Sequence, residues 1–340
     1  RVSRDNGRTW DDLHLLPEVT CQLPDGGIVN YPGGHHTDSF LGNSYEKKMR
    51  RIWPGMEIYT FNWGGHAHPF NDHVFVIENG EKEILLRYEE GPDFNLENPF
   101  DPEFCKTNCA YFGVGMAFAA DGTAYFPLVC HTSKDETAHT TGGIVLMRRN
   151  PASGEWLPSN QQYLSPELTS RGLLEPDVAV LENGTILVVV RGNDTPSTPG
   201  RKWFALSTNG GETLSQVNEL RYDDGSRFYS PSSIHSFQRS EKNGKLYWLA
   251  NITEDPPQGN GPRYPLYIAE IDETKVAVKK DSLVEVDRRR DEDPDVVQLS
   301  NFSVLENRET KDIEIYITRL GENPNHFWQT PVYRYLFIPP

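Results

Sequence analysis

The segment EPDVAVLENGTILVVVR begins with the carboxylate of Glu175 and ends with the guanidinium of Arg191. Apolar residues lie on both sides of an Asn-Gly pair, a pattern that predicts a β-hairpin. We expect a three-residue loop that ends at Gly184, so that Leu181 pairs with Thr185. The same register sets Glu175 opposite Arg191 on one face of the sheet. The two charged groups would form either a structural ion pair or one wall of a polar pocket.

A second group of residues that could do chemistry is rich in histidine. His66, His68 and Asp72 lie in the stretch WGGHAHPFNDH, shortly after a GGHH motif. Such side chains can bind a metal or act as acid and base. Their spacing matches no strong metal motif, and Gly and Pro surround them. We therefore expect a loop that contacts a sugar, with no metal and no cofactor.

Repeated turns indicate the elements that must position these residues. SRDNGRTW, from Ser3 to Trp10, fits the pattern S-x-D-x-G-x-T-W, and STNGGETL, ending at Leu214, fits it with Asn for Asp and Leu for Trp. A weaker echo ends at Trp156, which is 58 positions before Leu214. That interval is the size of one four-stranded propeller blade, and 340 residues hold about six of them.

Apolar runs recur around Asn-Gly and Asp-Gly turns in VFVIENGEKEILLRY, GMAFAADGTAYFPL, VAVLENGTILVVV and FQRSEKNGKLYWLA. No long stretch keeps a helical period. The sequence therefore predicts an all-β fold, a six-bladed β-propeller of four-stranded antiparallel blades. We expect one domain over residues 1–340, with the start of the first blade lying before Arg1.

Composition excludes several classes of partner. A formal net charge of −16 argues against a broad nucleic-acid or acidic-membrane surface, because both need clustered Lys and Arg. No apolar run is long enough to span a bilayer. Four cysteines are too few for a disulfide-stapled fold. A local cationic pocket stays compatible with this composition.

The repeated turns together with GLLEPDVAVLENGTILVVVR resemble the sialidase (neuraminidase) superfamily. In that family a glutamate precedes an arginine by sixteen positions, as Glu175 precedes Arg191. Upstream, GVGMAFAADGTAYFPLV is similar to the family's Gly-rich strand and turn; downstream, KWFALSTNGGETL matches its next turn. GKLYWLANITEDPPQGNGPRYPLYIAEID is similar to the segment with a second arginine, here Arg263. The resemblance runs in order over residues 1–275.

The resemblance implies an exo-glycosidase that acts on a terminal anionic sugar such as sialic acid. Glu175 would be the base that deprotonates a tyrosine nucleophile, and Arg191 and Arg263 would hold the substrate carboxylate through charge-assisted hydrogen bonds. Sialidases thereby differ from the usual pair of carboxylates. The resemblance also implies a glycan or polysaccharide partner and an extracellular or periplasmic location.

The sequence departs from the family at three places. The family's first arginine and its acidic residue precede the first repeated turn, and therefore precede Arg1. RRIWP, which contains Arg51, is an echo of that motif at a different place, so we treat Arg51 as a surface or loop residue. Where the family has Tyr-Ser on a late strand, this chain has Leu299 and Ser300. We expect Tyr229 as the substitute nucleophile, the alternative being a core or rim tyrosine.

Two other functions are compatible with the same residues. A non-catalytic glycan-binding propeller would have no nucleophile at all. A glycosidase or lyase acting on a uronate-containing polysaccharide would use His66 and His68, with the arginines holding the uronate carboxylate.

Overall fold

The computed structural model describes residues 113–129 and 142–340 in full, the backbone of the strands outside those ranges, and a few turn residues between 4 and 12. It divides the chain into two compact units. Unit 1 comprises Arg1–Phe112 and Leu128–His139, and unit 2 comprises Gly113–Pro127 and Thr140–Pro340.

Unit 1 is built from antiparallel strands. A two-stranded sheet pairs β1 (Glu18–Gln22) with β2 (Ile28–Pro32). A five-stranded meander follows, in the order β3 (Asp38–Ser39), β4 (Tyr45–Trp53), β5 (Met56–Trp63), β6 (His73–Glu78) and β7 (Glu81–Ile84). β8 (Cys109–Phe112) pairs with residues 128–131, the second half of β10 (Ala124–His131).

Unit 2 contains meanders in which strands consecutive in the sequence are neighbours. In the first, β10 pairs with β9 (Ala117–Phe118), and β11 (Gly143–Arg149) pairs with β12 (Trp156–Pro158). The second is β13 (Leu174–Val180), β14 (Ile186–Arg191), β15 (Lys202–Ser207) and β16 (Asn218–Glu219).

The third meander is β17 (His235–Arg239), β18 (Leu246–Asn251), β19 (Leu266–Asp272) and β20 (Ala277–Val278), with β21 (Val284–Asp287) also paired to β19. In the last sheet of unit 2, β22 (Gln298–Leu299), β23 (Ser303–Glu306) and β25 (Val332–Phe337) all pair with β24 (Ile313–Leu320). The 3₁₀ helix η2 (Lys280–Ser282) is the one helix in the described part of the chain.

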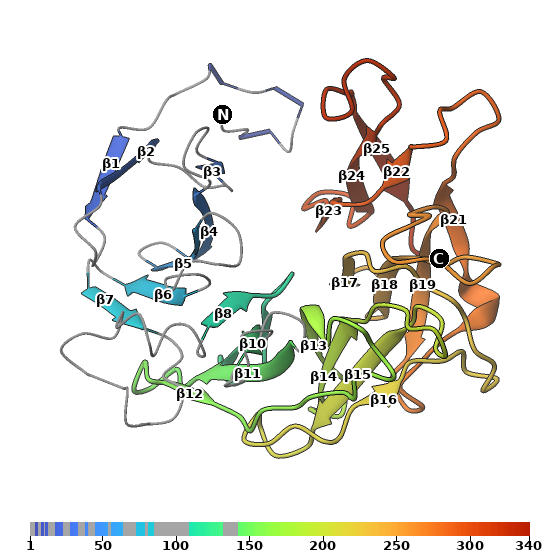
Figure 1. Ribbon diagram of the computed structural model, residues 1–340. Helices are drawn as coiled ribbons and strands as arrows, with labels where there is room; N and C mark the ends of the chain where they lie inside the picture. The colour runs from blue at the N-terminus through green and yellow to red at the C-terminus, as the bar shows by residue number, and fades with distance from the viewer. Residues whose placement is uncertain are drawn as a thin grey trace. The chain divides into compact units, whose positions relative to one another are not determined.

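Successive sheets of unit 2 pack face to face, as Figure 1 shows for the sheets that start at β13, β17 and β22. Strand β14 has apolar side chains on both of its faces, which explains this packing. Its residues Ile186, Val188 and Val190 pack toward β10 and β11, and the alternate residues Leu187 and Val189 pack toward β18 and β19. Because side chains alternate along a strand, an apolar run without polar interruptions is buried on both faces.

The four hairpins expected from Asn-Gly and Asp-Gly turns are all present. They join β6 to β7, β9 to β10, β13 to β14 and β17 to β18. The all-β class and the antiparallel four-stranded sheets are therefore confirmed. The closed ring of six blades stays a prediction.

In two of the repeated turns the Asp or Asn side chain accepts a hydrogen bond from the backbone of the turn. Asp5 accepts a hydrogen bond from the backbone N–H of Thr9 (2.8 Å), and Asn209 accepts one from Thr213 (3.1 Å). Such bonds close a turn locally. Among the described residues no helix has the length and apolar character needed to cross a bilayer.

Candidate functional site

The hairpin β13–β14 has the predicted turn, but the pairing of residues at its open end differs from the prediction. Leu181 N–H donates to Thr185 O (2.8 Å), and Gly184 takes the left-handed conformation with φ 81°. At the foot, however, Leu174 lies opposite Arg191, because two residues of β13 face one residue of β14 in a β-bulge. The prediction that Glu175 pairs directly with Arg191 was therefore wrong in register.

The bulge nevertheless brings the two charged side chains together. Glu175 Oε2 lies 2.6 Å from Arg191 Nη1, with the Arg191 side chain 10% exposed and that of Glu175 29% exposed. The Glu175 backbone has φ 45°, in the left-handed region that costs a residue with a Cβ about 1 kcal/mol. Backbone strain of this kind is frequent at functional sites.

Arg263, in the segment before β19, also lies near Arg191. Its Nη2 donates to the carbonyl oxygen of Ser232 (3.0 Å), to which Arg191 Nη1 also donates at 3.5 Å. Burial and, next, the charge of Arg191 lower the pKa of Arg263, and Glu175 opposes this. The three residues singled out from the sequence are therefore electrostatic neighbours.

Sequence reasoning missed a fourth charged group, Lys202. It is fully buried at the start of β15, opposite Arg191, and its Nζ donates to Ser233 O and to Pro231 O (3.5 Å). Burial, with the charges of Arg191 and Arg263 adding to it, lowers the pKa of Lys202 well below its ordinary value. Lys202 thus holds the backbone on both sides of the carbonyl that the arginines share.

Two further polar contacts align the elements that carry the site. Asp177 Oδ2 accepts a hydrogen bond from the backbone N–H of Phe237 (2.8 Å), which ties β13 to β17. Ser232 Oγ hydrogen-bonds to Asn193 Oδ1 (2.8 Å), which ties the segment before β17 to the one after β14. The sheets that present Arg191 and Ser232 are therefore joined next to the site.

The cluster has the character of an anion-binding site. Arg191 Nε is buried and has no hydrogen-bond acceptor in the described part of the chain. The carboxylate of Glu175 is paired with Arg191, and the positive charge of Arg263 lies near both. A carboxylate ligand would offset the repulsion between the guanidinium groups and supply acceptors to their N–H groups.

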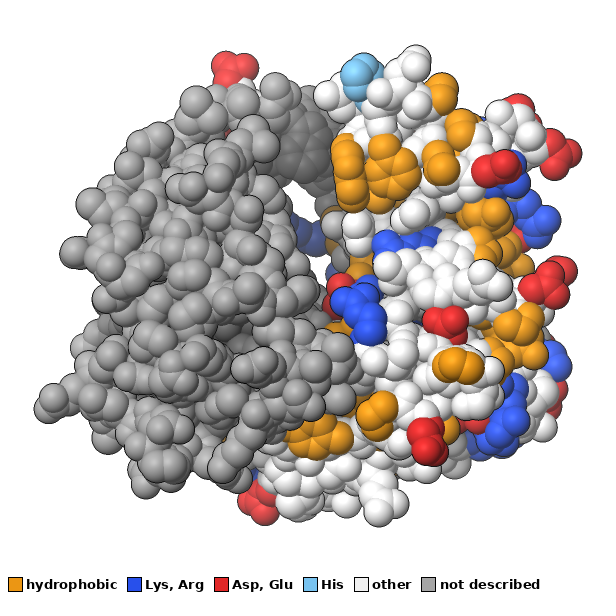
Figure 2. Space-filling view, viewed as in Figure 1, with side chains coloured by type: hydrophobic (Ala, Val, Ile, Leu, Met, Phe, Trp, Pro, Cys, Tyr) orange, Lys and Arg blue, Asp and Glu red, His pale blue; other side chains and the backbone are white. Residues whose placement is uncertain are grey.

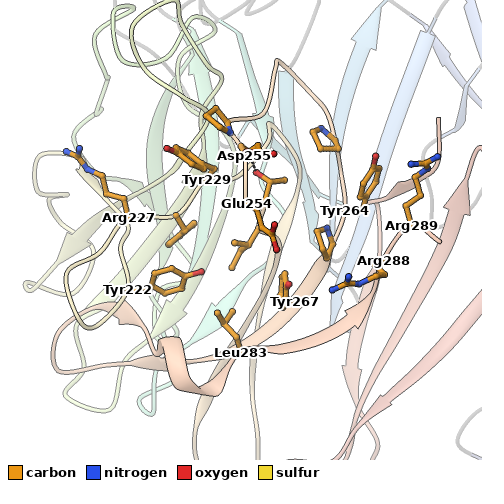
Figure 3. A pocket seen from close by; sticks show the side chains of 16 residues that line it. Tyr222, Arg227, Tyr229, Glu254, Asp255, Tyr264, Tyr267, Leu283, Arg288 and Arg289 are labelled. Atoms are coloured by element: carbon orange, nitrogen blue, oxygen red, sulfur yellow. Dashed lines mark hydrogen bonds between the residues drawn. The ribbon is translucent and has the colours of Figure 1, made fainter. Parts of the chain in front are cut away.

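Tyr229, the predicted nucleophile, lines a separate pocket. It lines a pocket of about 570 Å³ together with Tyr222, Tyr264 and Tyr267, as Figure 3 shows, and the Arg201 guanidinium lies 5.5 Å from its ring centre. Its catalytic role stays a prediction.

Leu299, which the sequence resemblance sets at the position of the family's tyrosine, is linked to Arg263 by a backbone hydrogen bond. Leu299 N–H donates to Arg263 O (2.8 Å), and Leu299 and Ser300 are both fully buried. The residue after Ser300, Asn301, has φ 59° and lies between β22 and β23. The contact with Arg263 is through the backbone, and the Leu299 side chain packs in the apolar core with Leu249 and Leu266.

The remaining predicted residues fall elsewhere. His66, His68 and Asp72 lie outside the described residues. Arg51 is part of strand β4, where it pairs with Glu57, so of the two alternatives for Arg51 the loop is wrong and the surface position stays a prediction. In the described part of the chain, no group of three or more His, Cys, Asp and Glu side chains could hold a metal ion.

Figure 2 shows Lys and Arg side chains interspersed with Asp and Glu over the described part of one face. A mixed surface of this kind has no extended field of one sign on that face. The positive character of the site is therefore local.

Comparisons with known proteins place the fold. No protein-family model and no curated protein matches the chain. NanB sialidase from Streptococcus pneumoniae is 13% identical, over 94% of this chain and 42% of that one, with a TM-score of 0.50. A mutant of the same sialidase is 12% identical, over 93% and 46%, also with a TM-score of 0.50.

A protein of unknown function from Dyadobacter fermentans DSM 18053 is 12% identical, over 89% of this chain and 85% of that one, with a TM-score of 0.49. This chain spans less than half the length of the two sialidase structures. At these identities the likeness concerns the fold alone.

Proposed function

We propose that the chain is a glycan-acting β-propeller, an exo-glycosidase of sialidase type that removes a terminal anionic sugar such as sialic acid. One observation carries the proposal: Arg191 and Arg263, presented by neighbouring sheets, meet at the carbonyl of Ser232 beside the carboxylate of Glu175. The resemblance in sequence and the likeness in fold to sialidases support the choice of reaction.

The arginines bind the carboxylate of the sugar. Arg191 has a free Nε–H among the described residues, and the Arg263 guanidinium is held by two backbone carbonyls, those of Ser232 and Asn260. Arg263 has no ion pair with a carboxylate among the described residues, and Glu175 offsets its charge only from a distance. A carboxylate would gain charge-assisted hydrogen bonds, which are about twice as strong as neutral ones.

Glu175 acts as the general base. In the hydrolysis the bond between the anomeric carbon and the glycosidic oxygen breaks; water gives its hydroxyl to the carbon and its proton to the departing oxygen. Glu175 accepts the proton of the nucleophile, for which Tyr229 stays our candidate. Arg191 Nη1, 2.6 Å from Glu175 Oε2, orients this carboxylate.

Binding without cleavage is the second candidate function, and Leu299 favours it. Leu299, which the sequence resemblance matches to the tyrosine of sialidases, is aliphatic and fully buried, and its backbone N–H donates to Arg263 O. A propeller with the arginines and without a nucleophile would retain recognition of the sugar and lose turnover.

One experiment separates the two. Wild type, Glu175→Gln, Tyr229→Phe and the control Glu182→Gln, which changes an exposed residue in the turn of the same hairpin, are incubated with a fluorogenic sialoside. Turnover that falls in Glu175→Gln and persists in the control supports hydrolysis. Binding of sialic acid by calorimetry without turnover in any protein supports the second function. A protein that neither binds nor cleaves sialosides contradicts both.

The proposal includes a cellular setting. Glycans with terminal anionic sugars occur outside cells, and we propose an extracellular or periplasmic location on the strength of the sequence resemblance. A polysaccharide panel that includes uronates extends the assay to the histidine-dependent alternative, in which His66 and His68 act.

A further inference from the structure

The pocket that contains Tyr229 is a second concave site in unit 2. It encloses about 570 Å³ and is lined mainly by the segment around Tyr222 to Tyr229, the segment from Ile252 to Tyr267, and the region after β21. Four tyrosines and three prolines line it, together with charged side chains such as Glu254 and Arg288 (Figure 3). A volume of this size accommodates one or two sugar rings or a small organic ligand.

The pocket is distinct from the arginine site although it shares a chain segment with it. Pro262 and Tyr264 line the pocket, whereas Arg263, between them, extends to Ser232. Adjacent side chains in extended backbone point to opposite sides. The segment therefore separates two sites of different chemistry.

Tyrosine gives the pocket both ring faces and hydroxyl groups. Tyr229, Tyr264 and Tyr267 are half-buried, so part of each ring faces the pocket. Burial raises the pKa of Tyr222 to about 12, so its hydroxyl is a neutral donor at physiological pH. Aromatic faces stack on the C–H faces of sugars, and phenol groups exchange hydrogen bonds with sugar hydroxyls.

The charges of the pocket favour a neutral ligand. Each of its arginines already has a carboxylate: Arg227 is paired with Glu219, Arg288 with Glu285 and Arg289 with Asp295. Glu254 and Asp255 are exposed and make no side-chain hydrogen bond or ion pair with any residue that the structure describes. Free carboxylates accept hydrogen bonds from sugar hydroxyls and repel anionic ligands.

We propose that this pocket binds a neutral sugar unit, stacked on its tyrosines and hydrogen-bonded through its hydroxyls to Glu254 and Asp255. The arginine site would accept anionic groups and the tyrosine pocket neutral ones. Tyr229 lines this pocket and is also the candidate nucleophile of the proposed function, so the pocket proposal rests on Tyr264, Tyr267 and the two carboxylates and not on the proposed reaction.

The test uses the full chain and defined neutral probes: lactose, cellotetraose, maltotetraose and diacetylchitobiose. Saturation-transfer NMR detects contact, and calorimetry measures affinity. We expect at least one probe to bind with a Kd in the range of about 1 mM, which is typical of a single weak sugar site. The double variant Glu254→Ala/Asp255→Ala should weaken that binding about tenfold.

Controls keep the result interpretable. The two acidic residues are exposed, so their removal should leave the melting temperature unchanged, and Tyr264→Ala provides a second, ring-deleting variant. Glu182→Ala should bind like wild type. Arg263→Ala should retain neutral-sugar binding even if all recognition of sialosides is lost, which separates this proposal from the proposed function.

The proposal is overturned if none of the four probes binds at about 10 mM, a concentration that detects any site with millimolar affinity. It is also overturned if binding is equal in wild type, the double variant and Tyr264→Ala, since the sugar would then lie elsewhere.

Discussion

Arg191, at the end of β14, and Arg263, in the segment before β19, lie far apart in the sequence and donate to the same acceptor, the carbonyl of Ser232, at 3.5 and 3.0 Å. Burial lowers the pKa of Arg263 most, and repulsion from the guanidinium of Arg191 at the same carbonyl lowers it further. Their convergence depends on the packing of neighbouring sheets, and it gives unit 2 a place where an anion is favoured.

Replacing Arg263 with alanine should weaken recognition of a carboxylated sugar. Arg263 is held by carbonyl groups rather than by a carboxylate, so its loss leaves no buried anion unpaired and the fold should be little affected. We expect KM for a sialoside, or Kd for sialic acid, to rise about tenfold to a hundredfold, the range for one charge-assisted contact. Arg308→Ala, at an exposed position, is the control. An unchanged KM would remove Arg263 from the site.

Replacing Glu175 with glutamine should reduce turnover and retain binding. Glutamine keeps the size of the side chain but cannot accept the nucleophile's proton, so kcat should fall by at least about a hundredfold, the lower end for general-base catalysis. KM should change little, because the arginines stay in place. Equal kcat values for Glu175→Gln and the Glu182→Gln control would show that another group is the base.

Local signals made the hairpin predictable. The Asn-Gly pair and the apolar alternation give the turn at Gly184 and the register from Val180 opposite Ile186 to Asp177 opposite Val189. The bulge at Glu175 carries no such signal, because it is stabilised by Arg191 and by packing against other strands. One extra residue then changes which side chains face each other.

The rest of the site depends on contacts that are distant in the sequence. In the sequence, Lys202 looks like an ordinary polar residue at the start of a strand. Its burial comes from the backbone of Pro231 and Ser233, about thirty positions away. The aromatic pocket around Tyr229 likewise combines segments that share no local pattern. Arg263 was matched through the family resemblance alone, since nothing around it predicts a partner in another sheet.

Gly184 provides a test of the hairpin turn. Its φ is 81°, and no atom lies within 4 Å of the place where a Cβ would be, so the cost of a side chain there is conformational and not steric. Gly184→Ala should destabilise the protein by about 1 kcal/mol, and Gly184→Asn by less, because asparagine tolerates left-handed backbone. Urea unfolding measures both. Equal stability of all three proteins would contradict the three-residue turn.

Acid should destabilise unit 2 through Glu314, which is 2% exposed. It accepts hydrogen bonds from Asn307 Nδ2 (2.7 Å), Tyr316 Oη (2.5 Å) and Arg334 Nε (3.0 Å). Burial alone would raise its pKa, but the hydrogen bonds from Arg334, Asn307 and Tyr316 outweigh burial and lower it from 4.5 to about 2.

Because the folded pKa lies below the unfolded one, ionised Glu314 stabilises the folded state above pH 4.5, and this stabilisation is lost as the pH falls toward 2. The loss should amount to roughly 3 kcal/mol. Glu314→Gln should be less stable at pH 7, since its amide N–H groups would face the donors of Tyr316 and Arg334. Its stability should also vary less with pH. Urea unfolding of both proteins at a series of pH values between 2 and 7 measures this, with Glu182→Gln as the control. A constant difference between the two proteins across that range would show that Glu314 is not the group whose protonation weakens the fold.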